Sequence, residues 1–392
     1  MSPIRILYLI DHLSSSRGGT EQHLFWLLRH FPRKGFEGHG CEGHGCEGHC
    51  IVFSHTRGTD PARLPAETLV FGDLYGHGKW NWWKRLRHLA RYLGDHEIDV
   101  VQAFSPLGEL AGLLATRLAR RGCLLGNRRD CGYHINRESR TIYRLLRLFG
   151  TRFVANSEAA RQAAHRLEGT PLDRIEVIRN PLPEERLREA MAKKMSRAML
   201  PFPPGADPGA KLVGMVATVR PVKDHETLLK AVPAVLAAHP ETYFPMVGEQ
   251  LPEHLAHLRK MAEELRIDRH ILWCGGLENP LRMMPLFDVG ALSSHSESFS
   301  NAVLEYAAVG LPAVVTDVGG LGEIVREGET GFLVPPRDPG TFAERLIRLL
   351  DDDAVRKRMG ENGRRFVGEH FAEPVILEQY AELYRKIAGK KS

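Results

Sequence analysis

Two carboxylates, Glu297 and Glu305, are separated by seven residues in a stretch that could bind a phosphorylated ligand. Residues 288–292 are apolar and bounded by small polar residues, which predicts a short buried strand. Residues 301–309 have helical spacing and end at Gly310, which predicts a helix. Glu297 should therefore lie in the loop at the carboxyl end of the strand, and Glu305 about two turns into the helix.

Ser300 or Asn301 can cap the predicted helix and leave its first N–H groups free. A helix N-terminus at the carboxyl end of a parallel strand attracts anions and suits a phosphate group. Carboxylates beside it can accept hydrogen bonds from the hydroxyl groups of a ligand. A ligand that combines phosphate with many hydroxyl groups is a nucleotide sugar. The alternative is that Glu297 is a solvated loop residue and Glu305 a surface helix residue.

The stretch from Glu297 to Glu305 resembles the E-x7-E signature of retaining glycosyltransferases of the GT-B fold, family four. The resemblance continues through residues 310–320, 323–325 and 331–334, and it covers roughly residues 5–388. It implies an α/β fold of the GT-B type, with two Rossmann-like domains facing each other across a cleft. It also implies transfer of a sugar from a nucleotide diphosphate sugar, with retention of configuration.

The same resemblance implies roles for the residues around the two glutamates. Glu297 would face the hexose, and Glu305 would bind the ribose hydroxyls. Backbone amides would hold the sugar and the phosphate at Phe299, Ser300, Asn301 and Ala302. Retention could proceed by front-face attack, in which the leaving phosphate accepts the acceptor's proton, or with Glu297 as a covalent nucleophile.

A basic pair, Arg220 and Lys223, follows the strand predicted at residues 211–217. The resemblance implies that this pair stabilises the diphosphate as it leaves, because a guanidinium fork and a compact ammonium neutralise phosphate well. Many members carry the arginine five residues before the lysine, where this chain has Thr218. Arg220 lies three residues before Lys223, a variant spacing that makes Lys223 the safer assignment. The alternative is a surface arginine and lysine in a turn.

Two further candidates belong to the N-terminal half. Residues 5–10 predict a strand that runs into a glycine loop and a helix, and Gly18, Gly19 and Glu21 match the GG-x-E loop of the family. That loop faces the cleft and touches the donor phosphate or the acceptor, although most such glycine pairs are turns. Asp130 also opens towards the cleft, as an acceptor contact or as an ion-paired loop aspartate.

Residues 79–93 predict an amphipathic helix with an apolar face and a basic face. Interfacial tryptophans with basic residues are typical of a helix that rests on an anionic membrane surface. The alternative is a helix that packs on the core and exposes its basic face to solvent. The membrane hypothesis involves Trp80, Trp82, Trp83, Lys84, Arg85, Arg87 and Arg91.

The unit EGHGC repeats in tandem from Glu37 to Cys50 and brings several histidines and cysteines together. These residue types could bind metal, but the spacing has no CxxC or HxxxH pattern, and the run leads into a strand predicted at residues 51–53. We interpret the repeat as a duplicated loop insertion that includes residues 39–48. The remaining cysteines form no obvious disulfide framework, so reduced thiols are expected.

The length of 392 residues suggests two domains of ordinary size. We expect an acceptor-side domain at residues 1–180, a nucleotide-sugar-binding domain at 181–373, and a last helix, 374–392, that packs back on the first domain. Residues 1–190 carry 28 Lys and Arg against 21 Asp and Glu, so this half could meet an anionic partner. No apolar run is long enough to cross a bilayer, so a cytoplasmic protein is expected, or one peripheral on the inner face of the cell membrane.

The sequence as a whole predicts a retaining glycosyltransferase that moves a sugar from a nucleotide diphosphate sugar to a lipid-linked or cell-surface glycan acceptor. The alternatives are a nucleotide-sugar epimerase or glycoside phosphorylase of the same fold, and a non-catalytic nucleotide-sugar-binding protein. Asp351, Asp352 and Asp353 open a late helix and no DxD motif stands at a strand end, so no metal cofactor is expected. No nucleic-acid partner is expected, and the donor base and sugar are left open.

Overall fold

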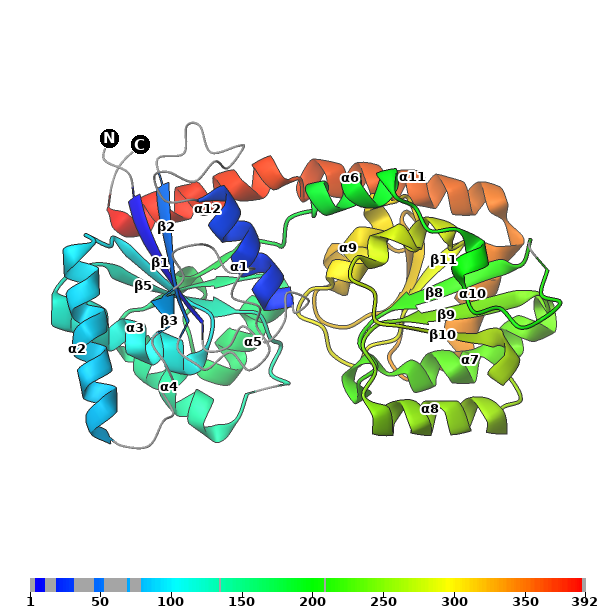
Figure 1. Ribbon diagram of the computed structural model, residues 1–392, viewed down its shortest axis with the longest axis horizontal. Helices are drawn as coiled ribbons and strands as arrows, with labels where there is room; N and C mark the ends of the chain where they lie inside the picture. Colours follow the sequence, from blue (N-terminus) through cyan, green and yellow to red (C-terminus); the bar gives the residue numbers. More distant parts are fainter. Residues whose placement is uncertain are drawn as a thin grey trace. The chain divides into compact units, whose positions relative to one another are not determined.

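The computed structural model divides the chain into two compact units (Figure 1). Unit 1 comprises residues 1–180 and 374–392, and unit 2 comprises residues 181–373. The structure describes residues 4–10, 19–31, 46–52, 69–70, 79–133, 135–207 and 209–389, of which 46–52, 69–70 and 79–81 are described by their backbone alone.

Unit 1 contains a seven-stranded parallel sheet in the order β3-β2-β1-β4-β5-β6-β7. The first strand is an almost uninterrupted run of apolar residues, as expected in a sheet covered on both faces. The strands are β1 (Ile4–Ile10), β2 (Cys46–Val52), β3 (Leu69–Val70), β4 (Val100–Ala103), β5 (Cys123–Arg128), β6 (Arg152–Ala155) and β7 (Ile175–Val177).

Alternate residues of each strand point to opposite faces of this sheet, and helices cover both faces. Leu7 and Leu9 of β1 pack on α2, α3 and α5, whereas Ile6 and Tyr8 pack on α1 and α12. The helices of unit 1 are α1 (Gly19–His30), α2 (Lys79–Asp95), α3 (Pro106–Ala119), α4 (Arg137–Leu148), α5 (Glu158–Glu168) and α12 (Glu373–Ala388). None of the described helices has an apolar stretch of the length that crossing a bilayer requires.

The last helix, α12, is part of the core of unit 1 although it lies at the far end of the sequence (Figure 1). Tyr380 and Tyr384 are fully buried, and their hydroxyl groups find polar partners as buried phenols usually do. The Tyr380 hydroxyl lies 2.8 Å from His23 Nε2, and the Tyr384 hydroxyl donates to Gln102 Oε1 at 2.5 Å. These contacts fix the position of α12 against α1 and β4.

Unit 2 contains a six-stranded parallel sheet in the order β10-β9-β8-β11-β12-β13. Its strands are β8 (Lys211–Val216), β9 (Thr242–Val247), β10 (Ile271–Gly275), β11 (Val289–Leu292), β12 (Ala313–Thr316) and β13 (Gly331–Val334). After β8 the chain builds the sheet outward on one side and then returns to build on the other. The point between β8 and β11 is therefore the topological switch point, where ligands bind in sheets of this kind.

Figure 1 shows α7 and α8 on one side of the unit 2 sheet and α9 and α11 on the other. Close approach of these helices needs small residues on the strands. A Cβ at Gly290 of β11 would lie 2.6 Å from the ring of Tyr306 in α9. The helices are α6 (Glu184–Ala192), α7 (His225–Ala238), α8 (Pro252–Glu264), α9 (Asn301–Ala308), α10 (Pro339–Asp351) and α11 (Asp353–His370).

The structure corrects the interpretation of the EGHGC repeat. β2 begins at Cys46, and its first residues pair with β1 in the register Ile4 to Cys46. The third repeat unit therefore lies in a strand and not in an inserted loop. All seven residues of β1 have backbone groups that can pair with β2. The pairing therefore begins before residue 51, where the apolar residues predicted the strand to start. Residues 37–45 lie outside the described residues.

Deleting residues 39–48 should still leave the thermal unfolding temperature nearly unchanged, as measured by differential scanning calorimetry. The deletion joins Gly38 to His49, so Glu37 and Gly38 take the places of Glu47 and Gly48 in the strand. Shortening a connection changes its closure entropy by only about 0.6 kcal/mol for each twofold change in length. Stoichiometric zinc in the purified protein that is lost on deletion, together with folding, would contradict this expectation.

A buried ionic network centred on Arg128 of β5 joins α3, α4, α5 and β6 of unit 1. Arg128 Nη1 lies 2.7 Å from Glu109 Oε1, and its Nε lies 2.8 Å from Glu168 Oε2. The guanidinium is also sandwiched between the rings of Tyr143 and Phe153, at 4.0 and 4.1 Å from their centroids. Burial raises the pKa of Glu109 to about 7 despite the attraction of Arg128, and the nearby charge of Glu168 adds to the rise.

Replacing Arg128 with Met should lower the free energy of unfolding by about 3–5 kcal/mol at pH 8, because two buried carboxylates lose their counter-charge. The loss should be smaller at pH 5.5. A carboxyl group whose pKa is raised in the folded state stabilises the protein when protonated, and that contribution disappears as pH rises through the folded-state pKa.

Urea unfolding at the two pH values measures this difference. Lys260→Ala is the control, because Lys260 is exposed and its partner Glu264 is 3.7 Å away on the same helix. That change should cost less than about 0.5 kcal/mol at either pH. Equal losses at pH 8 and pH 5.5 for the Arg128 variant would contradict the assigned charge states.

Candidate functional site

The candidate site of unit 2 lies at the carboxyl ends of β8 and β11, which pair in parallel. The loop after β8 leads through a short 3-10 turn, Pro221–Lys223, to α7. The loop after β11 leads through Glu297 to α9. Because the two strands are neighbours, the two loops lie side by side at the switch point.

Backbone and hydroxyl hydrogen bonds join the two loops. The N–H of His295 donates to the carbonyl of Val222 at 2.8 Å. The Ser293 hydroxyl donates to the carbonyl of Asp224 at 2.7 Å. Ser293 and Asp224 are both buried, so these bonds satisfy groups that water does not reach. They fix the spacing of the loops and hence the place of the side chains between them.

Asp224 gives the first loop its shape. Its φ of 46° is in the left-handed region, which aspartate tolerates better than most residues. Its carboxylate caps α7, accepting the Thr227 N–H at 3.3 Å and the Thr227 hydroxyl at 2.5 Å. His295 Nδ1 lies 3.3 Å from Oδ2 of the same carboxylate, the oxygen that accepts the Thr227 hydroxyl. This turn positions the preceding residue, Lys223.

The structure brings the two predicted residues Lys223 and Glu297 together. The ammonium of Lys223 donates to Glu297 Oε1, and the Ser294 hydroxyl donates to the same oxygen at 2.8 Å. Only 8% of Glu297 is exposed, so the alternative of a solvated loop residue is wrong. An ion pair with a supporting hydroxyl compensates the cost of burying the carboxylate.

Arg220, the other member of the predicted basic pair, stands apart from this contact. It is exposed, and its side chain has no hydrogen-bond or ion-pair partner among the residues that the structure describes. Its backbone carbonyl accepts the N–H of Lys223 at 2.9 Å, which holds both residues in one turn. An unpaired guanidinium beside Lys223 leaves its donors available to an anion.

The N-terminus of α9 has the free donors expected of an anion site. Ser300 is the N-cap residue, and its hydroxyl accepts the N–H of Val303 at 3.4 Å. The N–H groups of Phe299, Ser300 and Ala302 donate to no described residue. The ring of Phe299 is buried, 5.8 Å from that of Phe371, so its backbone rather than its side chain is available to a ligand.

Glu305 is 5% exposed, which makes the alternative of a surface helix residue wrong. Arg186 of α6 donates to Glu305 Oε1 at 3.3 Å. Burial raises the pKa of Glu305, and the charge of Arg186 opposes that rise. Arg186 carries no sequence signal as a partner of Glu305, because no local pattern links residues 119 positions apart.

The candidates in unit 1 fall at the start of α1 and after β5. Gly18 lies outside the described residues, and Gly19 is the first residue of α1. The charge of Glu21 acts favourably on the guanidinium of Arg129, which is half-buried. Asp130 accepts the N–H groups of Gly132 and Tyr133 at 3.1 and 3.0 Å, so it shapes its own turn.

The buried His23 and the half-buried Arg129 are two polar residues near these candidates that sequence reasoning missed. Burial lowers the pKa of His23 well below its ordinary value, and the charge of Arg129 adds to this effect. Its imidazole is therefore neutral and lies 2.8 Å from the Tyr380 hydroxyl. Arg129 donates to Asn180 Oδ1 at 2.8 Å. No signal at the level of sequence spacing marks either residue.

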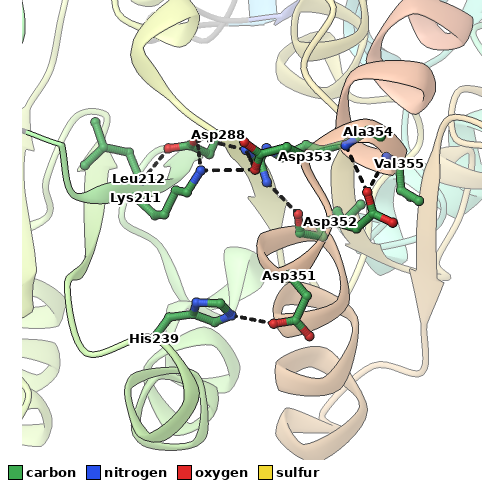
Figure 2. Close-up of polar contacts among 11 residues, drawn as sticks. Lys211, Leu212, His239, Asp288, Asp351, Asp352, Asp353, Ala354 and Val355 are labelled. Atoms are coloured by element: carbon green, nitrogen blue, oxygen red, sulfur yellow. Dashed lines mark hydrogen bonds and ion pairs between the residues drawn. The ribbon is translucent and has the colours of Figure 1, made fainter.

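The run of three aspartates has structural partners, as Figure 2 shows. Asp351 lies 2.9 Å from His239 Nε2, and Asp352 caps α11 by accepting the N–H groups of Ala354 and Val355. Asp353 accepts from Lys211 at 3.2 Å. Across the described ranges there is no group of three or more His, Cys, Asp or Glu side chains placed to hold a metal ion.

The amphipathic helix predicted at residues 79–93 is α2. Leu86, Leu89 and Leu93 are buried, and Trp82 is half-buried against the same core. On the opposite face, Trp83 is 55% exposed. Lys84, Arg87 and Arg91 are also exposed, and Arg85 is half-buried. The side chain of Trp80 is outside the described residues.

Two Rossmann-like domains, each built on an all-parallel sheet, define the chain as an α/β protein of the GT-B fold. The crystal structure of Anabaena Alr3699/HepE in complex with UDP matches it with a TM-score of 0.79 and 19% sequence identity. The match covers 98% of this chain and 100% of the other.

The chain belongs to the group 1 glycosyltransferases of the family-four type. The family "Glycosyl transferases group 1" matches residues 196–366, and "Glycosyltransferase Family 4" matches residues 17–186. A putative glycosyltransferase of Bacillus subtilis, EpsD, is 26% identical over 327 residues, which is 76% of this chain and 79% of that protein.

N-acetyl-alpha-D-glucosaminyl L-malate synthase of Bacillus anthracis is 30% identical over 180 residues. This match covers 46% of this chain and 46% of that protein, so the chain spans about half the length of this curated relative.

Proposed function

We propose that the chain is a retaining glycosyltransferase that transfers a hexosyl group from a nucleotide diphosphate sugar. The contact between Lys223 and Glu297 at the switch point carries this proposal. It places a cation and a carboxylate at the carboxyl edge of a parallel sheet, next to the free N–H groups of α9. A phosphorylated donor with sugar hydroxyls satisfies all three groups at once.

In the proposed reaction the donor diphosphate lies between the N-terminus of α9 and the turn that holds Arg220 and Lys223. The bond between the sugar carbon and the phosphate oxygen breaks, and the acceptor oxygen forms the new bond to that carbon. The acceptor proton goes to the leaving phosphate oxygen. Lys223 and Arg220 stabilise the negative charge that develops there, which metal ions do in some other folds. The reaction is therefore proposed to need no metal.

Glu297 is proposed to orient the hexose rather than to attack it. Its Oε1 already accepts two hydrogen bonds, from Lys223 and from Ser294, which lower its nucleophilicity. A covalent intermediate on Glu297 is the competing mechanism, and trapping a glycosylated Glu297 by mass spectrometry would establish it. Glu305 is proposed to bind the ribose hydroxyls, with Arg186 holding its carboxylate in place.

Unit 1 is proposed to bind the acceptor, a lipid-linked or cell-surface glycan. Glu21 and Asp130 remain the candidate contacts, both near the carboxyl edge of the unit 1 sheet. The exposed basic face of α2 supports an acceptor found at an anionic membrane surface. The protein would then act at the inner face of the cell membrane as a peripheral protein.

Lys223→Ala should lower kcat on the order of a hundredfold or more, because it removes a charge from the place where negative charge develops. The measurement is mass-spectrometric detection of transfer or hydrolysis, with the donor found by screening UDP-, GDP- and ADP-sugars. Lys260→Ala on the exposed face of α8 is the matched control and should keep full activity. A Lys223→Ala variant that retains activity within about threefold would contradict the proposed role of the lysine.

Wild-type protein should float with vesicles that contain phosphatidylglycerol and much less with zwitterionic vesicles. Each basic residue near an anionic surface contributes about 1 kcal/mol, so four give about 4 kcal/mol, which is enough for reversible binding. Rising salt should release the protein, because the attraction is screened. The test variant changes four residues of α2 to Gln: Lys84, Arg85, Arg87 and Arg91.

The matched control removes the same number of charges from exposed positions of α11. Its four changes to Gln are at Lys357, Arg358, Arg364 and Arg365. The α2 variant should lose lipid dependence while donor hydrolysis stays intact, and the α11 variant should float like wild type. Equal flotation of the α2 variant would show that the helix is an ordinary packing element.

A further inference from the structure

A cavity lies in unit 1, away from the carboxyl ends of the strands. Its volume is about 580 Å³. It opens where β5 begins at Cys123 and β6 begins at Arg152, beside the last turns of α3 and α4. Residues from the end of α12 complete its lining. This is the amino-terminal edge of the sheet, opposite the edge that the proposed acceptor site uses.

The lining of the cavity is strongly basic. It contains five cations and, among the described residues, no acidic side chain. The cations are Arg117, Arg120, Arg121, Arg152 and Lys386. The segment from residue 117 to 152 carries ten arginines against two acidic residues, so the imbalance extends beyond the cavity itself. Such a concentration of one sign raises the local concentration of anions.

Other residues of the chain pair with only some of these cations. Lys386 is paired with Glu176. Arg121 lies 3.9 Å from Asp99 Oδ1 and donates to the carbonyl of Glu97 at 3.0 Å. Arg120 and Arg152 have no side-chain partner within the described part of the chain. The carboxyl ends of α3 and α4 attract cations. At the end of α4, Arg117 donates to the C-cap carbonyl of Phe149 at 3.4 Å.

Thr151 supplies an independent indication of a binding site. It lines the cavity, is 5% exposed, and its hydroxyl has no hydrogen-bond partner among the described residues. Nε of Arg121, in the same lining, is also buried and unpaired. Buried polar atoms of folded proteins are normally hydrogen-bonded, and leaving one unpaired is costly. Acceptor oxygens of a ligand that reach these two buried atoms would satisfy them.

The rest of the lining is apolar. Leu113, Leu124 and Ile387 contribute side chains, and the ring of Phe149 is 47% exposed at the cavity. The space exceeds what a phosphate ion alone would fill. We propose that this cavity, here called the edge pocket, binds an organic phosphate whose apolar or aromatic portion packs against Phe149 and Ile387. Arg120, Arg152 and the Thr151 hydroxyl hold its phosphate oxygens.

Binding at the edge pocket would connect the end of α12 to the start of β5 and β6. Lys386 and Ile387 belong to α12, and the other lining residues to the segment 113–152. A ligand that contacts both stabilises the folded arrangement of unit 1 by mass action. The proposal concerns unit 1 alone and does not depend on the transfer reaction proposed for unit 2.

Cys123 offers a local readout because its exposed side chain lines the edge pocket. The experiment measures the rate of Cys123 alkylation by iodoacetamide in the full chain, by peptide mass spectrometry, with AMP as the soluble probe. AMP should slow the reaction of Cys123 at least about fivefold at saturation, as occupancy of a site excludes the reagent. Cys131 is the internal reference, and adenosine, which lacks the phosphate, should have no effect.

A readout at Cys123 is unaffected by nucleotide bound in unit 2, so failure here and failure of the proposed transfer reaction are distinguishable. Vesicles containing phosphatidic acid form a second arm, which tells whether the phosphate comes from a lipid or from a soluble molecule. Protection of Cys123 in either arm supports the edge pocket. Absence of protection in both arms overturns the proposal.

Variants decide whether protection arises at these residues. Arg120→Gln and Arg152→Gln should each raise the half-protecting concentration about tenfold, since each removes a charge-assisted hydrogen bond. Arg140→Gln, at an exposed position of α4, is the matched control and should change it less than about twofold. Protection that is unchanged in both pocket variants would overturn the assignment.

Thr151→Val separates a ligand contact from a structural role. Valine keeps the shape of threonine but removes the unpaired hydroxyl, so the unliganded protein should unfold at the same or a higher temperature. Protection by the effective probe should nevertheless need a several-fold higher concentration. A variant that loses thermal stability and keeps wild-type protection would show that the hydroxyl serves the fold and not a ligand.

Discussion

The parallel pairing of β8 with β11 is the constraint on which the candidate site depends. It sets side by side two loops whose residues are far apart in sequence, and hydrogen bonds from His295 and Ser293 then lock the loops together. Lys223 and Glu297, 74 positions apart, meet as a consequence. A lysine already ordered by a carboxylate loses little further freedom when a phosphate arrives, which favours binding and transition-state stabilisation alike.

The sequence predicted the parts of this site that depend on local chemistry. The resemblance of the stretch around Glu297 and Glu305 to family-four glycosyltransferases implied the GT-B fold. The strand and helix predicted on either side of Glu297 placed it between β11 and α9. What the sequence could not supply were contacts between distant residues. The pairing of Arg186 with Glu305 and the hydrogen bond from Ser294 to Glu297 follow from tertiary packing, and neither leaves a periodic signal.

The start of β2 shows a different limit of sequence reasoning. Glycine and histidine residues in the EGHGC unit have low strand propensity, so composition favoured a loop. Pairing depends instead on the neighbour: β1 is long, apolar and fully buried at its centre, and its backbone groups need partners along their whole length. A strand can therefore extend into residues of poor propensity where the adjacent strand requires it.

The excess of positive charge in the first half of the chain has several separate physical uses. Arg128 is buried between two carboxylates and two rings, where its charge is cancelled. Arg129 is held near Glu21 and Asn180. Arg120 and Arg152 differ from both, because neither burial nor a protein partner accounts for them. Charges without partners, beside a buried hydroxyl without a partner, have one common physical explanation: an anion that completes the edge pocket.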